Sequence, residues 1–448
     1  MSELIMSLSG TRGIVGDNLH PQLGVDMGMA VGTLIGKGPV IVGGDTRVSH
    51  ELLKGPIISG LISVGTDVID IGKVPTPTVQ QLILHYKAAA GMVITASHNP
   101  IMWNGVKLMN NTGSFFSTEE YDQFMSLYSA RDFQLVTWDK LGKVTKDETA
   151  LEIHINKILS LVNTDSIKNA NLKVLIDANQ GTGALANPLL LDKLGVNYDI
   201  INGDPSGLFS HNPEPVKQNL SEIISILSNG DYDIGFVQDA DADRLVILDE
   251  NGHFIGEDYS LAYCIDYILG LKEQNNPKVV VNLSTSLVIE DIATRHGASV
   301  MYTKIGEANV TQGLKDTGAV VGGEGNGGVI YPKVGWGRDS LVGIIIALKH
   351  LAESKKTVSQ TISTYPKFSM LRDKFEVTSR EAVSGYLTKI SSHFSDYPQD
   401  KQDGVKVMIN DGWIHVRPSN TEPIVRIFIE GSTTDQVNAL HKEVLSLA

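Results

Sequence analysis

The chain has 448 residues, of which 42% are hydrophobic and 20% charged, and this size and composition predict a globular protein with three or four domains. The formal net charge of −14 argues against non-specific binding to nucleic acid or to anionic membranes, because both require a basic surface. A single cysteine, Cys264, the lack of a signal-peptide pattern in residues 1–16 and the lack of a membrane-length apolar run together indicate a cytoplasmic protein.

A strand–helix–strand unit occurs three times between residues 40 and 302. In each copy an apolar strand leads into a polar loop and a helix, and a glycine separates that helix from a second apolar strand. Repeated units of this kind build sheets with parallel strands, so we expect an α/β fold with three similar mixed-sheet domains. The expected strands are 40–43 and 68–72, 174–177 and 198–201, and 279–282 and 300–302, with helices near 51–64, 188–194 and 287–295.

The C-terminal part of the chain follows a different order. Beyond a break at residues 364–366, an Asn-Asp-Gly turn joins two expected strands into a hairpin, and a third strand and a helix follow. This order predicts a smaller α+β fourth domain. The strands are expected at 405–409, 412–416 and 424–429 and the helix at 437–447, and the domains at 1–150, 151–255, 256–365 and 366–448.

Three short motifs carry charged side chains in expected loops. They are residues 9–13, with Arg12, residues 44–47, with Arg47, and residues 304–307. Taken alone, each motif predicts only a surface arginine or lysine.

The most informative stretch is Thr95-Ala96-Ser97-His98-Asn99-Pro100. A buried strand leads into it, and the Asn-Pro pair must end that strand, because proline lacks a backbone donor and keeps the preceding residue out of the helical region. Ser97 is then expected on a loop at the end of a rigid strand, a position that suits an exposed, reactive hydroxyl. Taken alone, the stretch is also compatible with an ordinary Ser/Asn turn.

An aspartate tract, residues 239–244, lies between two apolar strands. The carboxylates of Asp239, Asp241 and Asp243 would repel one another unless a cation bridges them, and hard oxygen ligands favour Mg²⁺. A calcium loop of the EF-hand kind has similar acidic spacing. That loop needs a glycine where this chain has Arg244, and helices rather than strands on both sides. A solvated acidic turn is the remaining alternative.

A glycine-rich tract, residues 322–328, follows an expected strand at 319–321. It contains a G-x-G-x-x-G spacing, but a strand follows it, so no helix N-terminus is available for a pyrophosphate. A glycine loop with Glu324 and Asn326 suits the recognition of sugar hydroxyls. A purely structural bend is the alternative.

A second dinucleotide-binding candidate is residues 181–186, with an acidic residue downstream. We expect its helix to begin later, with Asn187 as the cap and Pro188 at the first helical position. The sequence therefore does not favour a dinucleotide cofactor.

The stretch 417–423, with Arg426 after it, has the composition of an anion-binding loop. Hydroxyls, amides, turn N–H groups and a guanidinium fork can together hold a phosphate dianion. A structural turn is the alternative when the stretch is taken alone.

Together these stretches resemble the motifs of the α-D-phosphohexomutases, the family of phosphoglucomutases, phosphomannomutases and phosphoglucosamine mutases. The resemblance runs through the whole chain in the family's motif order. It rests on the serine loop with residues 104–107 after it, the aspartate tract, the glycine tract, the 417–423 loop and the three short motifs. It implies four domains around a central cleft.

The resemblance also implies a role for each residue. Ser97 would carry a phosphoryl group and, with Asp239, Asp241 and Asp243, would hold Mg²⁺. The family's serine and histidine in the glycine tract are replaced by Asn326 and Gly328, which leaves the preferred sugar open. Charge stabilisation or proton transfer is expected of Arg12, His98, Lys107 and Arg244, sugar binding of Lys304, Glu324 and Asn326, and phosphate binding of Arg417, Ser419, Asn420, Thr421 and Arg426.

The implied activity is an intramolecular phosphotransferase that moves a phosphoryl group between O6 and O1 of a hexose phosphate through phospho-Ser97 and a bisphosphate. One Mg²⁺ per chain, a hexose 1,6-bisphosphate activator and a monomer or homodimer are expected. The overall resemblance, including residues 337–340, favours the phosphoglucosamine branch over the phosphoglucomutase/phosphomannomutase branch. A Mg²⁺-dependent sugar-phosphate phosphatase would use the same serine and metal, but it would not need the remote 417–423 loop. A non-catalytic sugar-phosphate-binding protein would be expected to lack Ser97 or one of the aspartates.

Overall fold

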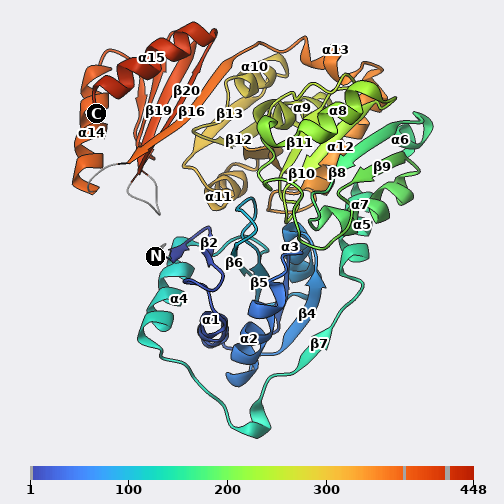
Figure 1. The fold of residues 1–448 in the computed structure, drawn as a ribbon, viewed down its shortest axis with the longest axis vertical. Coiled ribbons are helices and arrows are strands. Elements are labelled where there is room, and N and C mark those ends of the chain that lie inside the picture. The colour runs from blue at the N-terminus through green and yellow to red at the C-terminus, as the bar shows by residue number, and fades with distance from the viewer. Residues whose placement is uncertain (1–3, 377–379, 419–423) are drawn as a thin grey trace.

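The computed structural model describes residues 4–376, 380–418 and 424–448, and these residues form four sheets (Figure 1). The first three sheets are built on parallel strand–helix–strand units with added antiparallel strands, and the fourth is antiparallel. The expected architecture of three mixed α/β domains and one α+β domain is therefore confirmed. In Figure 1 the first sheet lies at the bottom in blue and the fourth at the upper left in red.

The first sheet has the strand order β1-β2-β6-β5-β3-β4-β7. The strands from β5 to β7 in this order pair in parallel, whereas β1, β2 and β6 join the sheet antiparallel. Its elements are β1 (Ile5–Ser7), β2 (Gly10–Ile14), α1 (Pro21–Ile35), β3 (Val40–Gly44), α2 (His50–Ser63), β4 (Val68–Lys73), α3 (Thr76–Tyr86), β5 (Ala90–Ile94), β6 (Trp103–Asn110), α4 (Thr118–Ala130), the 3₁₀ turn η1 (Trp138–Lys140), β7 (Val144–Lys146) and α5 (Ala150–Leu161).

Helices α1 and α2 pack closely on one face of this sheet because glycines let their backbones approach. A Cβ at Gly28 would lie 2.4 Å from Ile57 O, and one at Gly60 would lie 2.3 Å from the facing helix. The core on this face includes Val42 of β3, while Ile41 packs on the opposite face with α3. These two layers pack around β3 and β5. The 44–47 motif begins at the end of β3, and the serine loop follows the end of β5.

The second and third sheets have the strand orders β11-β10-β8-β9 and β13-β12-β14-β15. In each, one antiparallel hairpin strand, β11 or β15, is added to three parallel strands. The two sheets and their helices share one continuous apolar core. Their elements are α6 (Asp165–Asn169), β8 (Lys173–Asp177), α7 (Gly183–Leu194), β9 (Asn197–Ile201), the 3₁₀ turn η2 (Lys217–Asn219), α8 (Ser221–Asn229), β10 (Ile234–Gln238), β11 (Leu245–Leu248), α9 (Glu257–Gly270), β12 (Lys278–Asn282), α10 (Val288–Arg295), β13 (Ser299–Thr303), α11 (Glu307–Thr317), β14 (Val321–Glu324), β15 (Gly328–Ile330), α12 (Ser340–Ser354) and α13 (Val358–Ile362).

The expected start of the second-unit helix is wrong. Helix α7 begins at Gly183, so Pro188 lies inside it and not at its first position. Tertiary contacts fix the earlier start, because Thr182 N donates to Ala240 O (2.9 Å) and Asn187 Nδ2 donates to Gln238 Oε1 (2.7 Å). The polar groups around the first turn are thus satisfied by the aspartate tract and the strand before it.

The glycine tract is less of a loop than expected. Its first two glycines and Glu324 belong to β14, and β15 begins at Gly328. A Cβ at Gly322 would lie 2.3 Å from Val280 O on the paired strand β12. Glycine is therefore required there by close strand packing rather than by a flexible turn.

The fourth sheet is antiparallel, with the order β16-β20-β19-β18-β17. The expected strands are present, but the last helix begins at Thr434 rather than 437, because the Thr433 side chain accepts a hydrogen bond from Gln436 N as its cap. The elements are β16 (Ser369–Glu376), α14 (Arg380–His393), β17 (Gln399–Asp400), β18 (Val405–Ile409), β19 (Gly412–Pro418), β20 (Ile424–Gly431) and α15 (Thr434–Ser446).

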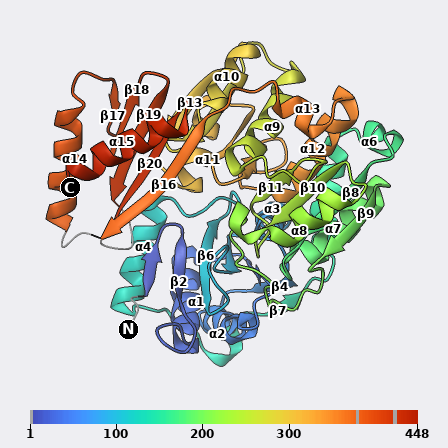
Figure 2. The same cartoon turned by 45° about the horizontal axis from the view of Figure 1, so that its top comes forward.

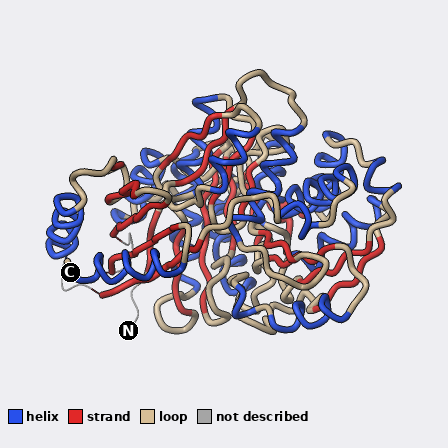
Figure 3. The backbone as a smooth tube through the Cα atoms, turned by 90° about the horizontal axis from the view of Figure 1, so that it is seen from above, coloured by secondary structure: helices blue, strands red, loops and turns tan. Residues whose placement is uncertain are grey.

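The fourth sheet lies beside the third and above the first (Figure 2). Seen from above, the C-terminus and the helix that leads to it, α15, lie toward one end of the molecule (Figure 3). Within the described ranges, no helix has the length and apolar character needed to cross a bilayer.

Candidate active site

The serine loop begins where β5 ends, at Ile94. Ser97 has a left-handed backbone (φ +50°), which a non-glycine residue adopts only when its surroundings impose it. Its N–H donates to Thr95 Oγ1 (2.8 Å) and its carbonyl accepts from Arg47 Nη2 (2.7 Å). The hydroxyl is not exposed as expected, because Ser97 is 1% accessible and its Oγ donates to Asp239 Oδ2 (2.8 Å).

A buried ion pair holds the backbone of this loop. Arg47 Nε lies 3.1 Å from Asp45 Oδ2, which also accepts from Thr95 Oγ1 (2.6 Å). The other guanidinium nitrogens donate to the carbonyls of Asn99 (2.7 Å) and Pro100 (2.9 Å). Arg47 is fully buried, so the prediction of a surface arginine in the 44–47 motif is wrong. The motif fixes the shape of the serine loop.

The aspartate tract occupies the turn between the antiparallel strands β10 and β11, as expected. One oxygen of each carboxylate, from Asp239, Asp241 and Asp243, lies within 4.8 Å of the others, and all three side chains are buried. Burial and the neighbouring carboxylates of Asp243 and Asp241 raise the pKa of Asp239 well above its ordinary value. The three groups therefore form a dense site of negative charge beside Ser97 Oγ.

Lys107 of β6 faces this site from the first domain. Its Nζ donates to Asp241 Oδ2 (2.7 Å) and Asp243 Oδ2 (2.8 Å), and its side chain is 2% exposed. Although burial opposes it, the two carboxylates raise the pKa of Lys107. Thr76 Oγ1 also donates to Asp241 Oδ2 (2.5 Å), so the first residue of α3 helps to orient that carboxylate.

The donor set fits a divalent cation with hard oxygen ligands. Asp241 Oδ1 and Asp243 Oδ1 are buried and, within the described part of the chain, accept no hydrogen bond. Buried carboxylate oxygens that accept no hydrogen bond are costly and are stabilised by a bound cation or a proton. With Asp239 and Ser97 Oγ alongside, these atoms could hold Mg²⁺.

The cationic residues expected at the reacting centre are together. Arg244 Nη2 donates to His98 Nδ1 (2.8 Å), and Arg12 Nη1 donates to Asn99 Oδ1 (3.2 Å). Burial, then the neighbouring Arg244 guanidinium, lowers the pKa of Arg12, and burial with both arginines lowers the pKa of His98 well below its ordinary value. Arg12 lies in strand β2 rather than in a loop. Crowded positive charge beside Ser97 suits a phosphate group.

The expected sugar-binding residues are divided between buried and exposed positions. Glu324 is 5% exposed, and its Oε1 accepts from Asn282 Nδ2 (2.9 Å) and Gly306 N (3.0 Å). Asn326 Oδ1 is buried without a hydrogen-bond partner among the described residues, so it has a free acceptor. Lys304 is exposed at the start of the 304–307 motif.

Sequence reasoning did not assign Arg338, which joins these parts. Its guanidinium contacts Asp243 Oδ2 (2.8 Å), Glu307 Oε2 (2.8 Å) and Glu324 Oε2 (3.2 Å). It lies in the stretch 337–340, and the only local signal was a single arginine between a glycine and the capping aspartate of a helix.

The phosphate-binding residues of the fourth domain are only partly described. Ser419, Asn420 and Thr421 lie outside the described residues. Arg417 and Arg426 are direct partners across β19 and β20, so their side chains start from the same face of the sheet. Arg417 Nε donates to Asp403 Oδ1 (3.2 Å), and Asp403 Oδ2 accepts from Ile305 N (3.0 Å), beside Lys304.

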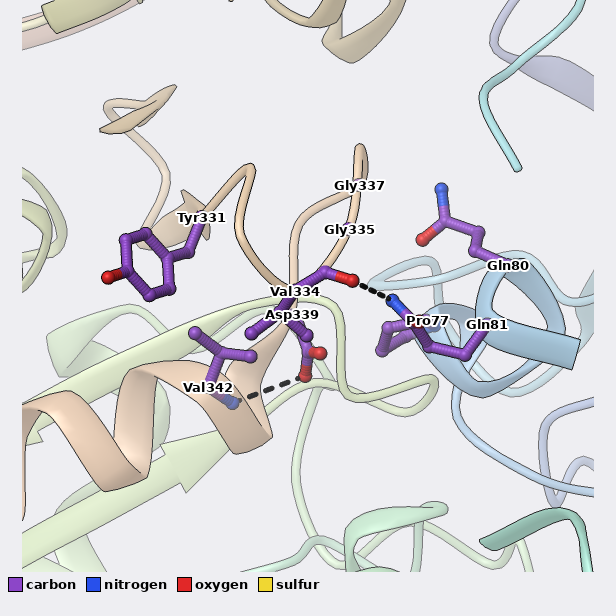
Figure 4. Close-up of a pocket in the computed structure, with 9 residues that line it drawn as sticks. All are labelled: Pro77, Gln80, Gln81, Tyr331, Val334, Gly335, Gly337, Asp339 and Val342. Atoms are coloured by element: carbon purple, nitrogen blue, oxygen red, sulfur yellow. Dashed lines mark hydrogen bonds between the residues drawn. The ribbon is translucent and has the colours of Figure 1, made fainter. Parts of the chain in front are cut away.

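The first and third domains are in close contact on both sides of Arg338 in the chain, at Gly337 and Asp339 (Figure 4). Gln81 of α3 donates to Val334 O (3.0 Å), and a Cβ at Gly337 would lie 2.0 Å from the Gln80 side chain. His154 of α5 adds a further link, because its ring bridges Thr78 (2.9 Å) and Asp339 (2.9 Å). These contacts and this fully buried bridge fix the connector that carries Arg338.

Four family models match the chain in order. They are the phosphoglucomutase/phosphomannomutase alpha/beta/alpha domains I, II and III, at residues 4–135, 152–252 and 256–368, and the C-terminal domain, at residues 370–447.

Curated relatives match over nearly their whole length. A phosphoglucomutase/phosphomannomutase from Thermococcus kodakarensis is 38% identical over 95% of this chain and 94% of its own. A probable phosphoglucosamine mutase from Methanopyrus kandleri is 35% identical over 98% of this chain and 96% of its own.

Solved structures share the fold. A phosphoglucomutase/phosphomannomutase family protein from Burkholderia thailandensis superposes with a TM-score of 0.84 at 22% identity, over 99% of this chain and 97% of its own. The Aspergillus fumigatus N-acetylphosphoglucosamine mutase, solved in complex with GlcNAc-6P and magnesium, superposes with a TM-score of 0.66 at 16% identity, over 100% of this chain and 95% of its own.

Proposed function

The chain belongs to the phosphoglucomutase/phosphomannomutase family and is a phosphohexomutase, and we propose that it moves a phosphoryl group between O6 and O1 of a hexose phosphate through phospho-Ser97. The observation that carries this proposal is the hydrogen bond from Ser97 Oγ to Asp239, within a buried set of three carboxylates. A serine hydroxyl is a poor nucleophile unaided, and phosphoryl transfer needs alignment and charge neutralisation.

Asp239, Asp241, Asp243 and Ser97 would hold one Mg²⁺, which would neutralise charge on the transferring phosphoryl group. Arg12 and Arg244 would grip the phosphoryl oxygens from the other side. Their guanidinium groups are fixed cations, so this contribution does not depend on proton transfer. The strained backbone at Ser97 would keep its hydroxyl between the aspartate carboxylates and the two arginines.

Lys107 suits the proton transfer better than His98 does. His98 Nδ1 accepts from Arg244, which assigns the proton of the neutral ring to Nε2 and leaves no free basic nitrogen. Lys107 is held protonated between two carboxylates, and it could give a proton to Ser97 Oγ as the phosphoryl group leaves and then take up the proton that the attacking sugar hydroxyl releases. The same residue would take the proton back in the reverse step.

The second phosphate of the bisphosphate would bind in the fourth domain. Arg417, Arg426 and the 419–421 segment would hold it while Glu324, Asn326 and Lys304 contact the sugar. When the sugar turns over, the two phosphates exchange places and the second returns to Ser97. This division explains why one set of cations is needed at the serine and another on a different domain.

For the substrate, we propose a phosphoglucosamine preference, with glucose or mannose phosphates as the alternative. The resemblance of the chain to relatives named for either activity supports both readings. A hexose 1,6-bisphosphate would act as activator by phosphorylating Ser97. We place the enzyme in the cytoplasm, which its single, buried cysteine, Cys264, supports. A monomer or homodimer is proposed with it.

The test is mutase turnover on glucosamine 6-phosphate, glucose 1-phosphate and mannose 1-phosphate, with Mg²⁺ and a hexose bisphosphate. Comparison of kcat/KM measures discrimination between the sugars. A clear preference for the amino sugar supports the proposal, and a preference for glucose or mannose selects the alternative. Release of free phosphate without isomer formation would refute a mutase and favour the phosphatase.

The serine assignment has its own test. Ser97→Ala should abolish turnover and incorporation of phosphate from the bisphosphate, measured by intact mass. Ser114→Ala, on the same domain, is the matched control and should retain both. Full turnover of Ser97→Ala with bisphosphate supplied would refute the phosphoserine route.

A further inference from the structure

The side chain of Arg338 is buried, and its guanidinium contacts carboxylates of two domains. Arg338 lies on the connector from β15 to α12 and pairs with Ile330 through an isolated antiparallel bridge. The residue is 7% exposed. Burying an arginine is costly unless every side of the fork is paired.

Three carboxylates supply that pairing. Nε meets Glu307 Oε2 at 2.8 Å, Nη2 meets Asp243 Oδ2 at 2.8 Å and Nη1 meets Glu324 Oε2 at 3.2 Å. Two of them belong to the third domain, and the third is part of the aspartate tract of the second domain. Each nitrogen faces a different carboxylate, a geometry that the point charge of lysine cannot reproduce.

These contacts determine how two functional carboxylates face the substrate. Asp243 Oδ2 accepts from both Arg338 and Lys107, which leaves Asp243 Oδ1 without a hydrogen bond among the described residues. Glu324 Oε1 is fixed by Asn282 and Gly306 N, and Arg338 fixes Oε2. One side chain therefore sets the position of the sugar-binding carboxylate relative to the aspartate tract.

The glycine at position 328 makes room for this side chain. A Cβ at Gly328 would lie 2.2 Å from Arg338 Cδ and 2.8 Å from its Cγ. Gly328 has no left-handed φ that would require glycine. Glycine is therefore required at position 328 because the Arg338 side chain occupies the space that a Cβ would need.

We propose that Arg338 is a positioning residue that holds Glu324 in register with Asp243, so that the sugar is gripped at the place where the phosphoryl group is transferred. This inference rests on the proposed function and adds a residue to it. Arg338 acts through Glu324 and Asp243, and Gly328 acts through Arg338.

The test is a double-mutant cycle in kcat/KM for the preferred sugar phosphate. Arg338→Gln and Glu324→Gln should each reduce kcat/KM by about 30-fold or more, an order of magnitude typical of misplaced binding groups. If Arg338 acts through Glu324, the double variant should be hardly worse than the poorer single variant. Arg338→Lys should recover only part of the loss.

The control cycle pairs Arg338→Gln with Arg426→Gln, on the fourth domain. These changes should multiply, because the two residues share no contact in the described structure. A merely structural role would give multiplied losses in both cycles and would overturn the proposal, as would an Arg338→Gln enzyme with at least half of wild-type kcat/KM.

Gly328→Ala tests the position of the Arg338 side chain without removing its positive charge. It should displace the guanidinium and reproduce the kinetic loss of Arg338→Gln, with little further effect when the two changes are combined. Wild-type activity in Gly328→Ala would contradict the proposal even if Arg338→Gln fails to fold. Absence of mutase turnover in the wild-type protein would instead refute the proposed function.

Discussion

The site at Ser97 and the site on the fourth sheet are built in opposite ways. Ser97, Lys107 and the aspartate tract are almost fully buried, and each is held by contacts from a second domain. On the fourth sheet, Arg426 is only partly buried, and Arg417 is tied to the third domain through the carboxylate of Asp403. The described groups of the first site are buried and fixed by contacts between domains, whereas at the second site Arg417 is buried against Asp403 and Arg426 remains partly exposed.

The difference between the two sites follows from the part of the substrate that each would bind. The reacting end must stabilise developing charge, and preorganised groups in a water-excluded site do this best. The other end only has to hold a phosphate and then release it when the sugar turns over. Changes at the first site should therefore reduce kcat, and changes at the second should mainly raise KM.

The largest effect should come from the carboxylates. Asp241→Asn removes a charged ligand and should lower kcat by about 10³-fold, since a metal ion contributes several kcal/mol to such transition states. Its Mg²⁺ affinity, measured by calorimetry, should fall as well. Asp231→Asn, exposed on the same domain, is the control and should change neither quantity. Unchanged Mg²⁺ affinity in Asp241→Asn would remove this residue from the metal site.

A smaller effect is expected at Lys107, where charge balance can be tested. Lys107→Met should lower kcat by about 10²-fold or more through lost proton transfer. It also leaves two buried carboxylates without their cation, a change that costs about 3–5 kcal/mol in comparable buried pairs. Mg²⁺ should compensate, so it should raise the Tm of the variant more than that of the wild type.

The matched control for this prediction is Lys157→Met, which removes an exposed lysine from α5. Its Tm should respond to Mg²⁺ as the wild type does. An equal Mg²⁺-induced rise in Lys107→Met and wild type would mean that lysine and metal do not share the carboxylates.

A change at the second site should act mainly on binding. Asp403→Asn keeps the size of the side chain but loses its charge, so it cannot accept from both Ile305 N and Arg417 as the carboxylate does. We expect KM to rise by about 3–10-fold with kcat changed by less than about threefold, corresponding to the net contribution of one hydrogen bond, roughly 1 kcal/mol. Asp411→Asn, in the exposed turn of the same domain, should behave as wild type. A fall in kcat without a change in KM would erase the contrast between the two sites.

Sequence reasoning succeeded where a motif and its scaffold are adjacent in the chain. The serine loop and the aspartate tract each directly follow a buried strand, and the structure brings Ser97 to Asp239 as the two loops from neighbouring domains meet. Glycines were harder to interpret. Gly322 was expected in a loop after a strand at 319–321, but it lies within a strand, where the structure requires glycine for close strand packing.

Residues whose role depends on distant partners could not be predicted. Arg338 meets Asp243 across 95 positions of the chain, and Asp403 meets Ile305 across 98. No local pattern encodes such pairs. The start of α7 failed for the same reason, since the contact between Thr182 and Ala240 outweighs the preference of Pro188 for a first turn.

The last prediction concerns stability rather than turnover, at the contact between α9 of the third domain and β16 of the fourth. Asp258 of α9 accepts from Arg372 of β16 (3.0 Å) and from Ser286 N (2.9 Å), and burial raises its pKa to about 7 despite the arginine. An unfolded aspartate has a pKa of about 3.9, so the folded state binds the proton more tightly. Stability from this group is complete below about pH 4 and declines as pH rises to about 7, by at most about 1.4 kcal/mol per pH unit. Asp258→Asn removes the titration. Urea midpoints from pH 5 to 7 should then fall less steeply in the variant than in the wild type, and parallel profiles would show that Asp258 is already ionised across this range.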